Sequence, residues 1–160
     1  MLVDGDDTPN KYVLGRQFTA YGMRGDATYA YRATSRKSSL GGQTLLVKTP
    51  SGELESYVRY VGVQGATCAL AATAVADMLG VPRRTIESSL ARLEPFAGRM
   101  QVLDGIKHTK LIDDTYNATP VAVTAALDVL YGSRTKQRIA VLGSMNELGE
   151  YAREAHEEVG

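Results

Sequence analysis

An abrupt change of residue pattern at Gly62 limits the folds open to this chain of 160 residues. Before Gly62, alternating segments rich in β-forming residues are separated by glycine-containing turns, a pattern typical of strands. The predicted strands are residues 11–21, 27–34, 43–48 and 55–61. The last two are joined by Thr49-Pro50-Ser51-Gly52, a strong turn signal. We therefore expect the first part of the chain to form an antiparallel sheet rich in hairpins.

After Gly62 the composition favours helices. Residues 68–79 are rich in alanine and end at Gly80, a residue suited to a helix C-terminus, and residues 85–93 have the pattern of a short amphipathic helix. The small side chains of the first helix would let it pack close to a sheet. Residues 95–98, Pro-Phe-Ala-Gly, interrupt the pattern and mark a predicted domain boundary. The predicted domains are therefore residues 1–97 and 98–160.

The second predicted domain alternates strands, at residues 110–113 and 138–142, with helices, at residues 121–131 and 147–158. Thr119-Pro120 combines an N-cap residue with proline at the first helical position. Units of this size imply a parallel sheet with right-handed crossovers. The predicted fold class is α/β, with a partial Rossmann-like parallel domain after the hairpin-rich region. Two parallel strands are too few to cover two helices, so we expect a complete sheet to need further strands.

Charge and cysteine content exclude several classes of function. Lysine plus arginine and aspartate plus glutamate both total 18, which argues against nucleic-acid binding driven by bulk charge. The single cysteine, Cys68, cannot form an internal disulfide, and together with two histidines it makes no spaced metal motif, so no metal ligands are predicted. The first ten residues lack the features of a signal peptide, and no apolar run is long enough to span a membrane. We expect a cytoplasmic protein.

The adjacent carboxylates Asp113 and Asp114, at the end of the 110–113 segment, are the first candidate functional residues. In parallel sheets, ligands bind beyond the carboxyl ends of strands, where a carboxylate can accept hydrogen bonds from ribose hydroxyls. The alternative is a solvated turn in which one aspartate caps a backbone amide. Neighbouring residues of an extended chain point to opposite sides, so we do not expect this pair to act together as an acid/base dyad.

Several stretches of the sequence resemble the Mur ligase family, and within it the MurF branch most. The resemblance is carried by IDDTYNATPVAVTAALDVL, RIAVLGSMNELGEYAREAHEEVG, VGVQGATCALAATAVADMLGV and PFAGRM. It covers nearly the whole chain. It implies that the chain corresponds to the end of the family's central ATPase domain and the start of its C-terminal domain.

The resemblance also implies roles for individual residues. Asp114 matches the aspartate that contacts the ATP ribose, with Asp113 as a supporting residue, and Arg99 matches the nucleotide-contacting arginine of the Gly-Arg hinge. Tyr116 and Asn117 match the same motif and are expected to shape its loop. The plainer interpretations are a surface ion pair for Arg99, turn formation for Asn117 and packing on the hinge for Tyr116.

Departures from the family pattern limit what this chain is expected to do. The family's His-Asn-x-x-Asn, whose asparagines help to hold adenine, is replaced here by Gln64, Gly65 and Cys68, and the acid of Val-Leu-Gly-Asp-Met is replaced by Ser144. No G-x-x-x-x-G-K-[ST] phosphate loop occurs, and SLGGQT at residues 39–44 lacks the lysine that such a loop needs. The family's metal-binding glutamate and carbamylated lysine lie upstream of the matched region.

The function implied by the resemblance is ATP-dependent amide-bond formation in peptidoglycan precursor synthesis. The family's MurF branch adds D-alanyl-D-alanine to a UDP-N-acetylmuramoyl tripeptide through an acyl phosphate, with ATP and Mg²⁺. Because the phosphate loop is missing, we expect no catalytic residues in this chain and no turnover by it alone. Two alternatives remain: a non-catalytic nucleotide-sensing or interaction module derived from such a ligase, and a folylpolyglutamate synthase-like ligase.

Overall fold

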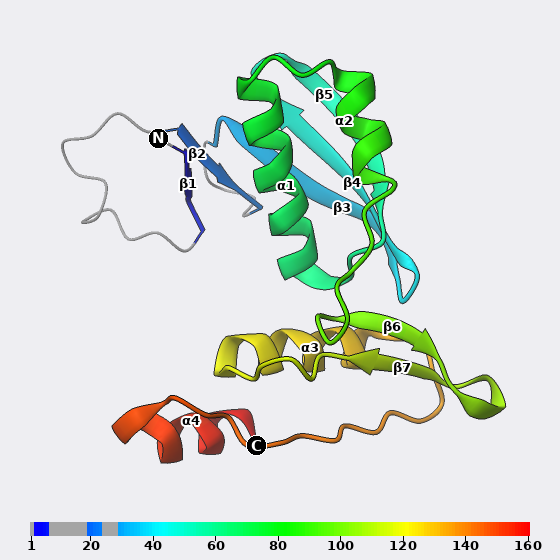
Figure 1. Cartoon of the computed structure of the whole chain (residues 1–160), viewed down its shortest axis with the longest axis vertical. Helices are drawn as coiled ribbons and strands as arrows, with labels where there is room; N and C mark the ends of the chain where they lie inside the picture. The colour runs from blue at the N-terminus through cyan, green and yellow to red at the C-terminus, as the bar shows by residue number, and fades with distance from the viewer. Residues whose placement is uncertain (1, 7–18, 24–28) are drawn as a thin grey trace.

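The computed structural model describes residues 2–6, 19–23 and 29–160, which form an α/β arrangement of two sheets and four α-helices (Figure 1). The larger sheet has the strand order β1-β2-β3-β4-β5, and β6 and β7 form a second sheet. The strands are β1 Leu2–Asp4, β2 Thr19–Gly22, β3 Tyr31–Ser39, β4 Gly42–Thr49, β5 Gly52–Val58, β6 Gln101–Asp104 and β7 Lys110–Asp113. The helices are α1 Gly62–Met78, α2 Arg83–Leu90, α3 Pro120–Gly132 and α4 Ala152–Val159. Among the residues so described, no helix is both long and apolar enough to cross a lipid bilayer.

The five-stranded sheet is mixed, which corrects the expectation of an antiparallel sheet. Strands β3, β4 and β5 form the predicted antiparallel meander, but β1 pairs with β2, and β2 with β3, in parallel. Alternating residues specify which face of a strand is buried, but not the direction of its neighbour. Of the strands predicted at residues 11–21 and 27–34, positions 11–18, 27 and 28 lie outside the described residues.

The core lies between one face of this sheet and the helices α1 and α2 (Figure 1). Leu45 and Val47 of β4 and Val58 of β5 are at most 1% exposed. Ala66 and Ala74 of α1 are completely buried against this face. Because alanine carries only a methyl group, the helix backbone approaches the sheet closely, as the alanine-rich segment predicted.

The end of α1 is defined by a glycine motif. Gly80 has φ +72°, its N–H donates to the carbonyl of Asp77 at 2.9 Å, and Val81 N–H donates to the carbonyl of Ala76 at 3.0 Å. This pair of bonds is a Schellman motif, which satisfies carbonyls left without partners at a helix end. The predicted C-terminus is therefore confirmed, whereas the helix begins at Gly62, six residues before the predicted start at residue 68.

The second half of the chain departs from the predicted parallel arrangement. Strand β7 forms where it was predicted, but it pairs antiparallel with β6, which the sequence analysis missed, and a 3-10 turn at Ile106–His108 lies between them. Residues 138–142 form no strand, and Ile139 and Val141 are 70% and 91% exposed. A strand requires a partner for its backbone N–H and C=O groups, and no strand in the described part of the chain pairs with this segment. The partial Rossmann-like sheet is therefore not formed in this structure.

The helices of this half follow their predicted signals more closely. Thr119 Oγ1 accepts a hydrogen bond from Ala122 N–H at 3.3 Å and Pro120 opens α3, as the N-cap pattern predicted. Helix α4 begins at Ala152 after a 3-10 turn at Gly149–Tyr151, later than the predicted residue 147. Helix α3 contacts α1 on one side and α4 on another. The division into domains at residues 97 and 98 stays a prediction.

Two hydroxyl–carboxylate contacts tie strand β3 and the β4–β5 turn to the end of α1. Tyr31 Oη donates to Asp77 Oδ2 at 3.0 Å, and Ser51 Oγ donates to the other oxygen of the same carboxylate. Burial of the phenol, followed by the hydrogen bond to Asp77 and its negative charge, raises the pKa of Tyr31 above its ordinary value of 10.0.

We expect the free energy of unfolding to fall as the pH rises above about 10, because the tyrosine then ionises in the unfolded chain while the folded state keeps it protonated. In Tyr31→Phe this alkaline loss should be smaller, and stability at pH 8 should be lower by about 1 kcal/mol for the lost hydrogen bond. Urea unfolding at pH 8 and pH 10.5 measures both effects. Tyr151→Phe, at a side chain 73% exposed, is the control that should change neither. Equal alkaline losses in wild type and Tyr31→Phe would contradict the assignment.

Candidate functional site

Two turns that are separate in sequence meet at the start of the β6–β7 hairpin. The pairing of Gln101 with Asp113 brings the residues just before β6 beside the residues just after β7. Tyr116 N–H donates to the carbonyl of Gly98 at 3.1 Å, which joins the two turns directly. We call residues 98–100 and 113–117 together the hinge cluster. All five predicted site residues lie in it: Arg99, Asp113, Asp114, Tyr116 and Asn117.

The two aspartates of the hinge cluster have different partners. Asp114 Oδ1 accepts a hydrogen bond from Met100 N–H at 2.9 Å, across the two turns. Asp113 Oδ1 accepts from its neighbour Thr115, from the backbone N–H at 3.2 Å and from the hydroxyl at 2.7 Å. Asp113 therefore stabilises its own turn, while Asp114 holds the turn that carries Arg99.

Arg99 and Tyr116 form a stacked pair on the surface. The guanidinium carbon of Arg99 lies 4.1 Å from the centroid of the Tyr116 ring, a cation–π geometry, and the tyrosine is 72% exposed. Asn117 Oδ1 accepts from Ala118 N–H at 3.0 Å. The pair presents a flat cationic surface to solvent next to the carboxylate of Asp114.

The start of α1 shows what replaces the asparagines of the family pattern. A Cβ atom added to Gly65 would lie 2.6 Å from the Cβ of Tyr60, so no side chain fits at position 65 without a shift of the backbone. Cys68, one turn later, is exposed, and its side chain carries no amide group. Gln64 Nε2 lies 3.5 Å from the carbonyl of Val121 in α3, the outer limit of a hydrogen bond.

Two residues that organise this region were missed by sequence reasoning. Gln43, 2% exposed in β4, donates through Nε2 to the carbonyls of Tyr60 at 3.1 Å and Gly62 at 2.7 Å, and so holds the turn that leads into α1. The sequence signal that could have identified Gln43 is its side-chain amide, which occupies a core-facing position in a strand of alternating residues. Met100 has φ +50°, an unusual value for a residue other than glycine, and no sequence pattern indicated it.

The side chains of the hinge cluster are suited to binding polar and charged groups. A carboxylate can accept hydrogen bonds from hydroxyl groups, and a guanidinium stacked on a ring can pair with an anion or cover an aromatic group. Across residues 2–6, 19–23 and 29–160, no three histidine, cysteine or acidic side chains gather closely enough to hold a metal ion.

Comparisons with known proteins identify the family. Residues 98–160 match the family model described as Mur ligase, glutamate ligase domain. The UDP-N-acetylmuramoyl-tripeptide–D-alanyl-D-alanine ligase of Haemophilus influenzae is 35% identical over 130 residues, which are 81% of this chain and 28% of that protein. The chain belongs to the Mur ligase family. Its sequence spans less than a third of the length of that relative.

Solved MurF structures share this fold over nearly the whole chain. MurF from Thermotoga maritima, in complex with ADP, has a TM-score of 0.82 at 25% identity and covers 99% of this chain and 36% of its own. MurF from Acinetobacter baumannii also has a TM-score of 0.82, at 26% identity, over 94% of this chain and 32% of its own. The chain is therefore a MurF-like member of the family, and the matched family domain includes every residue of the hinge cluster.

The close approach of the two turns depends on Gly98. It has φ +69°, and an added Cβ would lie 3.1 Å from Tyr116 N and 3.3 Å from Tyr116 Cβ. We expect Gly98→Ala to lower the free energy of unfolding by about 1–2 kcal/mol, because the left-handed conformation is strained for residues with a Cβ. Gly132→Ala, at the end of α3 where an added Cβ meets nothing within 4 Å, should be neutral or stabilising. Urea unfolding of both variants is the measurement, and equal effects would contradict the role of Gly98.

Proposed function

We propose that this chain forms the adenosine side of the ATP site in a MurF-like amide ligase. The observation that carries the proposal is the junction of the two turns of the hinge cluster, through the bonds from Met100 N–H to Asp114 and from Tyr116 N–H to Gly98. The same cluster lies within the matched Mur ligase domain. The MurF of Thermotoga maritima was solved in complex with ADP, which supports an adenine nucleotide as the ligand.

Each residue of the hinge cluster has a distinct role in this proposal. Asp114 is held through Oδ1 by Met100 N–H, so its carboxylate is oriented before the ligand arrives and can accept hydrogen bonds from the ribose hydroxyls. Arg99, supported from below by the Tyr116 ring, covers the adenine or pairs with a phosphate. Asp113 and Asn117 bond to backbone amides of their own turn and maintain its shape.

The reaction that these residues would serve follows from family membership. ATP phosphorylates the terminal carboxylate of a UDP-N-acetylmuramoyl tripeptide, which gives an acyl phosphate and ADP. The amine of D-alanyl-D-alanine then attacks the acyl carbon, and phosphate leaves as the amide forms. The substrates named for the relative from Haemophilus influenzae support this assignment. Both precursors and ATP are cytoplasmic compounds, so we also propose a cytoplasmic location.

Nucleotide binding by the purified chain tests the proposed site. We expect ATP to bind in a calorimetric titration and Asp114→Ala and Arg99→Ala each to weaken binding by about tenfold or more, the effect of losing one charge-assisted contact. Asp114→Asn keeps an acceptor for Met100 N–H and should fall between wild type and alanine. Asp104→Ala, at the other end of the β6–β7 hairpin, is the matched control and should bind as wild type does. Failure of the folded wild-type chain to bind ATP would remove the proposal.

A second experiment addresses turnover. The printed sequence contains no G-x-x-x-x-G-K-[ST] loop to hold the ATP phosphates, so we expect no ADP release above background when the chain is given ATP, the tripeptide substrate and D-alanyl-D-alanine. A coupled ADP-release assay measures this, with a MurF that contains the loop as the positive control. Clear turnover by the chain of 160 residues would overturn the expectation.

The alternative functions differ in their support. Two observations favour a non-catalytic nucleotide-sensing or interaction module. Gly65 and Cys68 offer no side-chain amide to a nucleobase, and position 65 has no space for a side chain. The titration with ATP separates the nucleotide-sensing form from a pure interaction module. The folylpolyglutamate synthase-like alternative has weaker support. Both MurF structures match this chain with a TM-score of 0.82, whereas a folylpolyglutamate synthase from Thermotoga maritima matches it with a TM-score of 0.56 at 15% identity.

A further inference from the structure

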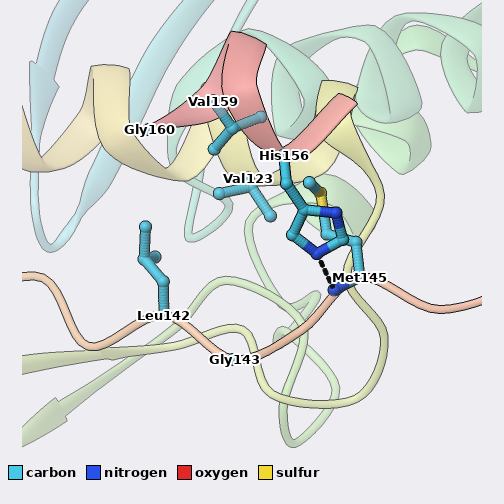
Figure 2. A pocket seen from close by; sticks show the side chains of 7 residues that line it. All are labelled: Val123, Leu142, Gly143, Met145, His156, Val159 and Gly160. Carbon is cyan, nitrogen blue, oxygen red and sulfur yellow. Dashed lines mark hydrogen bonds between the residues drawn. The ribbon is translucent and has the colours of Figure 1, made fainter. Parts of the chain in front are cut away.

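A single buried residue anchors the segment that leads into α4. Residues 134–144 are exposed throughout, whereas the side chain of Met145 is 5% exposed. The backbone N–H of Met145 donates to His156 Nε2 at 3.0 Å, the contact drawn in Figure 2. The turn at residues 143–145 is therefore held at two points, by the buried methionine side chain and by the histidine ring of α4.

The two contacts of His156 identify its protonation state. A backbone N–H can only donate, so Nε2 must present a lone pair to Met145. Nδ1 lies 2.6 Å from the carbonyl of Ala152, which can only accept, so Nδ1 carries the proton. Both contacts are satisfied together only by the neutral ring with hydrogen on Nδ1. A second proton on Nε2 would place two donors against each other and break the bond to Met145.

The surroundings of the ring contain few charges that could compete with this effect. The other residues lining the hollow beside His156 are Val123, Leu142, Gly143, Met145, Val159 and Gly160, none of which has a charged side chain (Figure 2). On α4 itself, Arg153 is paired with Glu157 at 2.8 Å, and Glu154 and Glu158 are exposed.

We propose that neutral His156, protonated on Nδ1, is a latch that positions the turn at residues 143–145 against α3 and α4. Ser144 and Asn146 are exposed on either side of the anchored Met145, so the latch sets where these two polar side chains stand. The role assigned to His156 is that of a positioning residue, and it does not depend on nucleotide binding or on the proposed ligase reaction.

Nuclear magnetic resonance of the ¹⁵N-labelled chain tests the latch directly. We expect the two-bond ¹H–¹⁵N spectrum at pH 8 to show the His156 ring protonated on Nδ1 only. At pH 8 the Met145 amide should exchange with solvent about tenfold more slowly than an unprotected amide, after correction for the intrinsic rate, as expected for one hydrogen bond. A Met145 amide without this protection, or a ring protonated on Nε2 at pH 8, would overturn the proposal.

Two variants separate the latch from simple packing. His156→Gln offers an amide oxygen near the position of Nε2, so Met145 should stay protected. His156→Leu keeps the volume without the acceptor, so Met145 should be unprotected. His108→Gln, at the other histidine of the chain, is the control and should keep the protection of wild type. Protection of Met145 in His156→Leu equal to that of wild type would overturn the proposal, and if His156→Leu does not fold, the tautomer of the wild-type ring still decides.

Discussion

The close packing of α1 against the five-stranded sheet is the interaction on which the rest of the structure depends. Ala66, Ala69 and Ala74 are at most 3% exposed, and their small side chains let the helix backbone lie close to the strands. The same helix contacts strands β2, β3 and β4, lies beside α2 and touches α3 near its own start (Figure 1). An added Cβ on Gly62 would lie 2.8 Å from Val129 Cγ2, so the approach of α1 to α3 is equally close. Met100 of the hinge cluster lies near the same contact, because its Cε would be 3.9 Å from that added Cβ.

The candidate site illustrates how far residue-by-residue reasoning reaches. The sequence named Asp113 and Asp114 from their place at a strand end, and the resemblance to the Mur ligase family added Arg99, Tyr116 and Asn117. Their roles remain proposals. The sequence did not predict that the turns meet, because the meeting depends on strand β6, whose apolar run is only a few residues long. It also depends on the left-handed conformation of Met100, which no local pattern encodes. The bond from Met100 N–H to Asp114 crosses between the two turns, and only pairing of β6 with β7 brings its ends together.

The parallel strand predicted at residues 138–142 failed for a related reason. Its apolar residues are typical of a buried strand, and this pattern suits a strand whose two faces are both covered by other elements. In the structure, Ile139 and Val141 are mostly exposed. The segment is held at its start, where Arg138 donates to the carbonyls of Leu130 and Ser133, and after its end, where Met145 is buried and held by His156. A hydrophobic pattern indicates that a segment is suited to a buried position. Strand pairing also requires the backbone of another strand within hydrogen-bonding distance.

The sequence by itself determined the features that arise within a few residues of the chain. These are the turn at residues 49–52, the N-cap at Thr119, the Schellman motif at Gly80 and the alternation that buries one face of β4 and β5, since each follows from local dihedral preferences or from side-chain period. The tertiary structure alone decided the parallel pairing of β2 with β3, the contacts of Gln43 with the turn before α1, the joining of the hinge cluster and the contact of His156 with Met145. Each of these links groups that are distant along the backbone. Their geometry is set by how the elements pack, and no local preference of the chain encodes it.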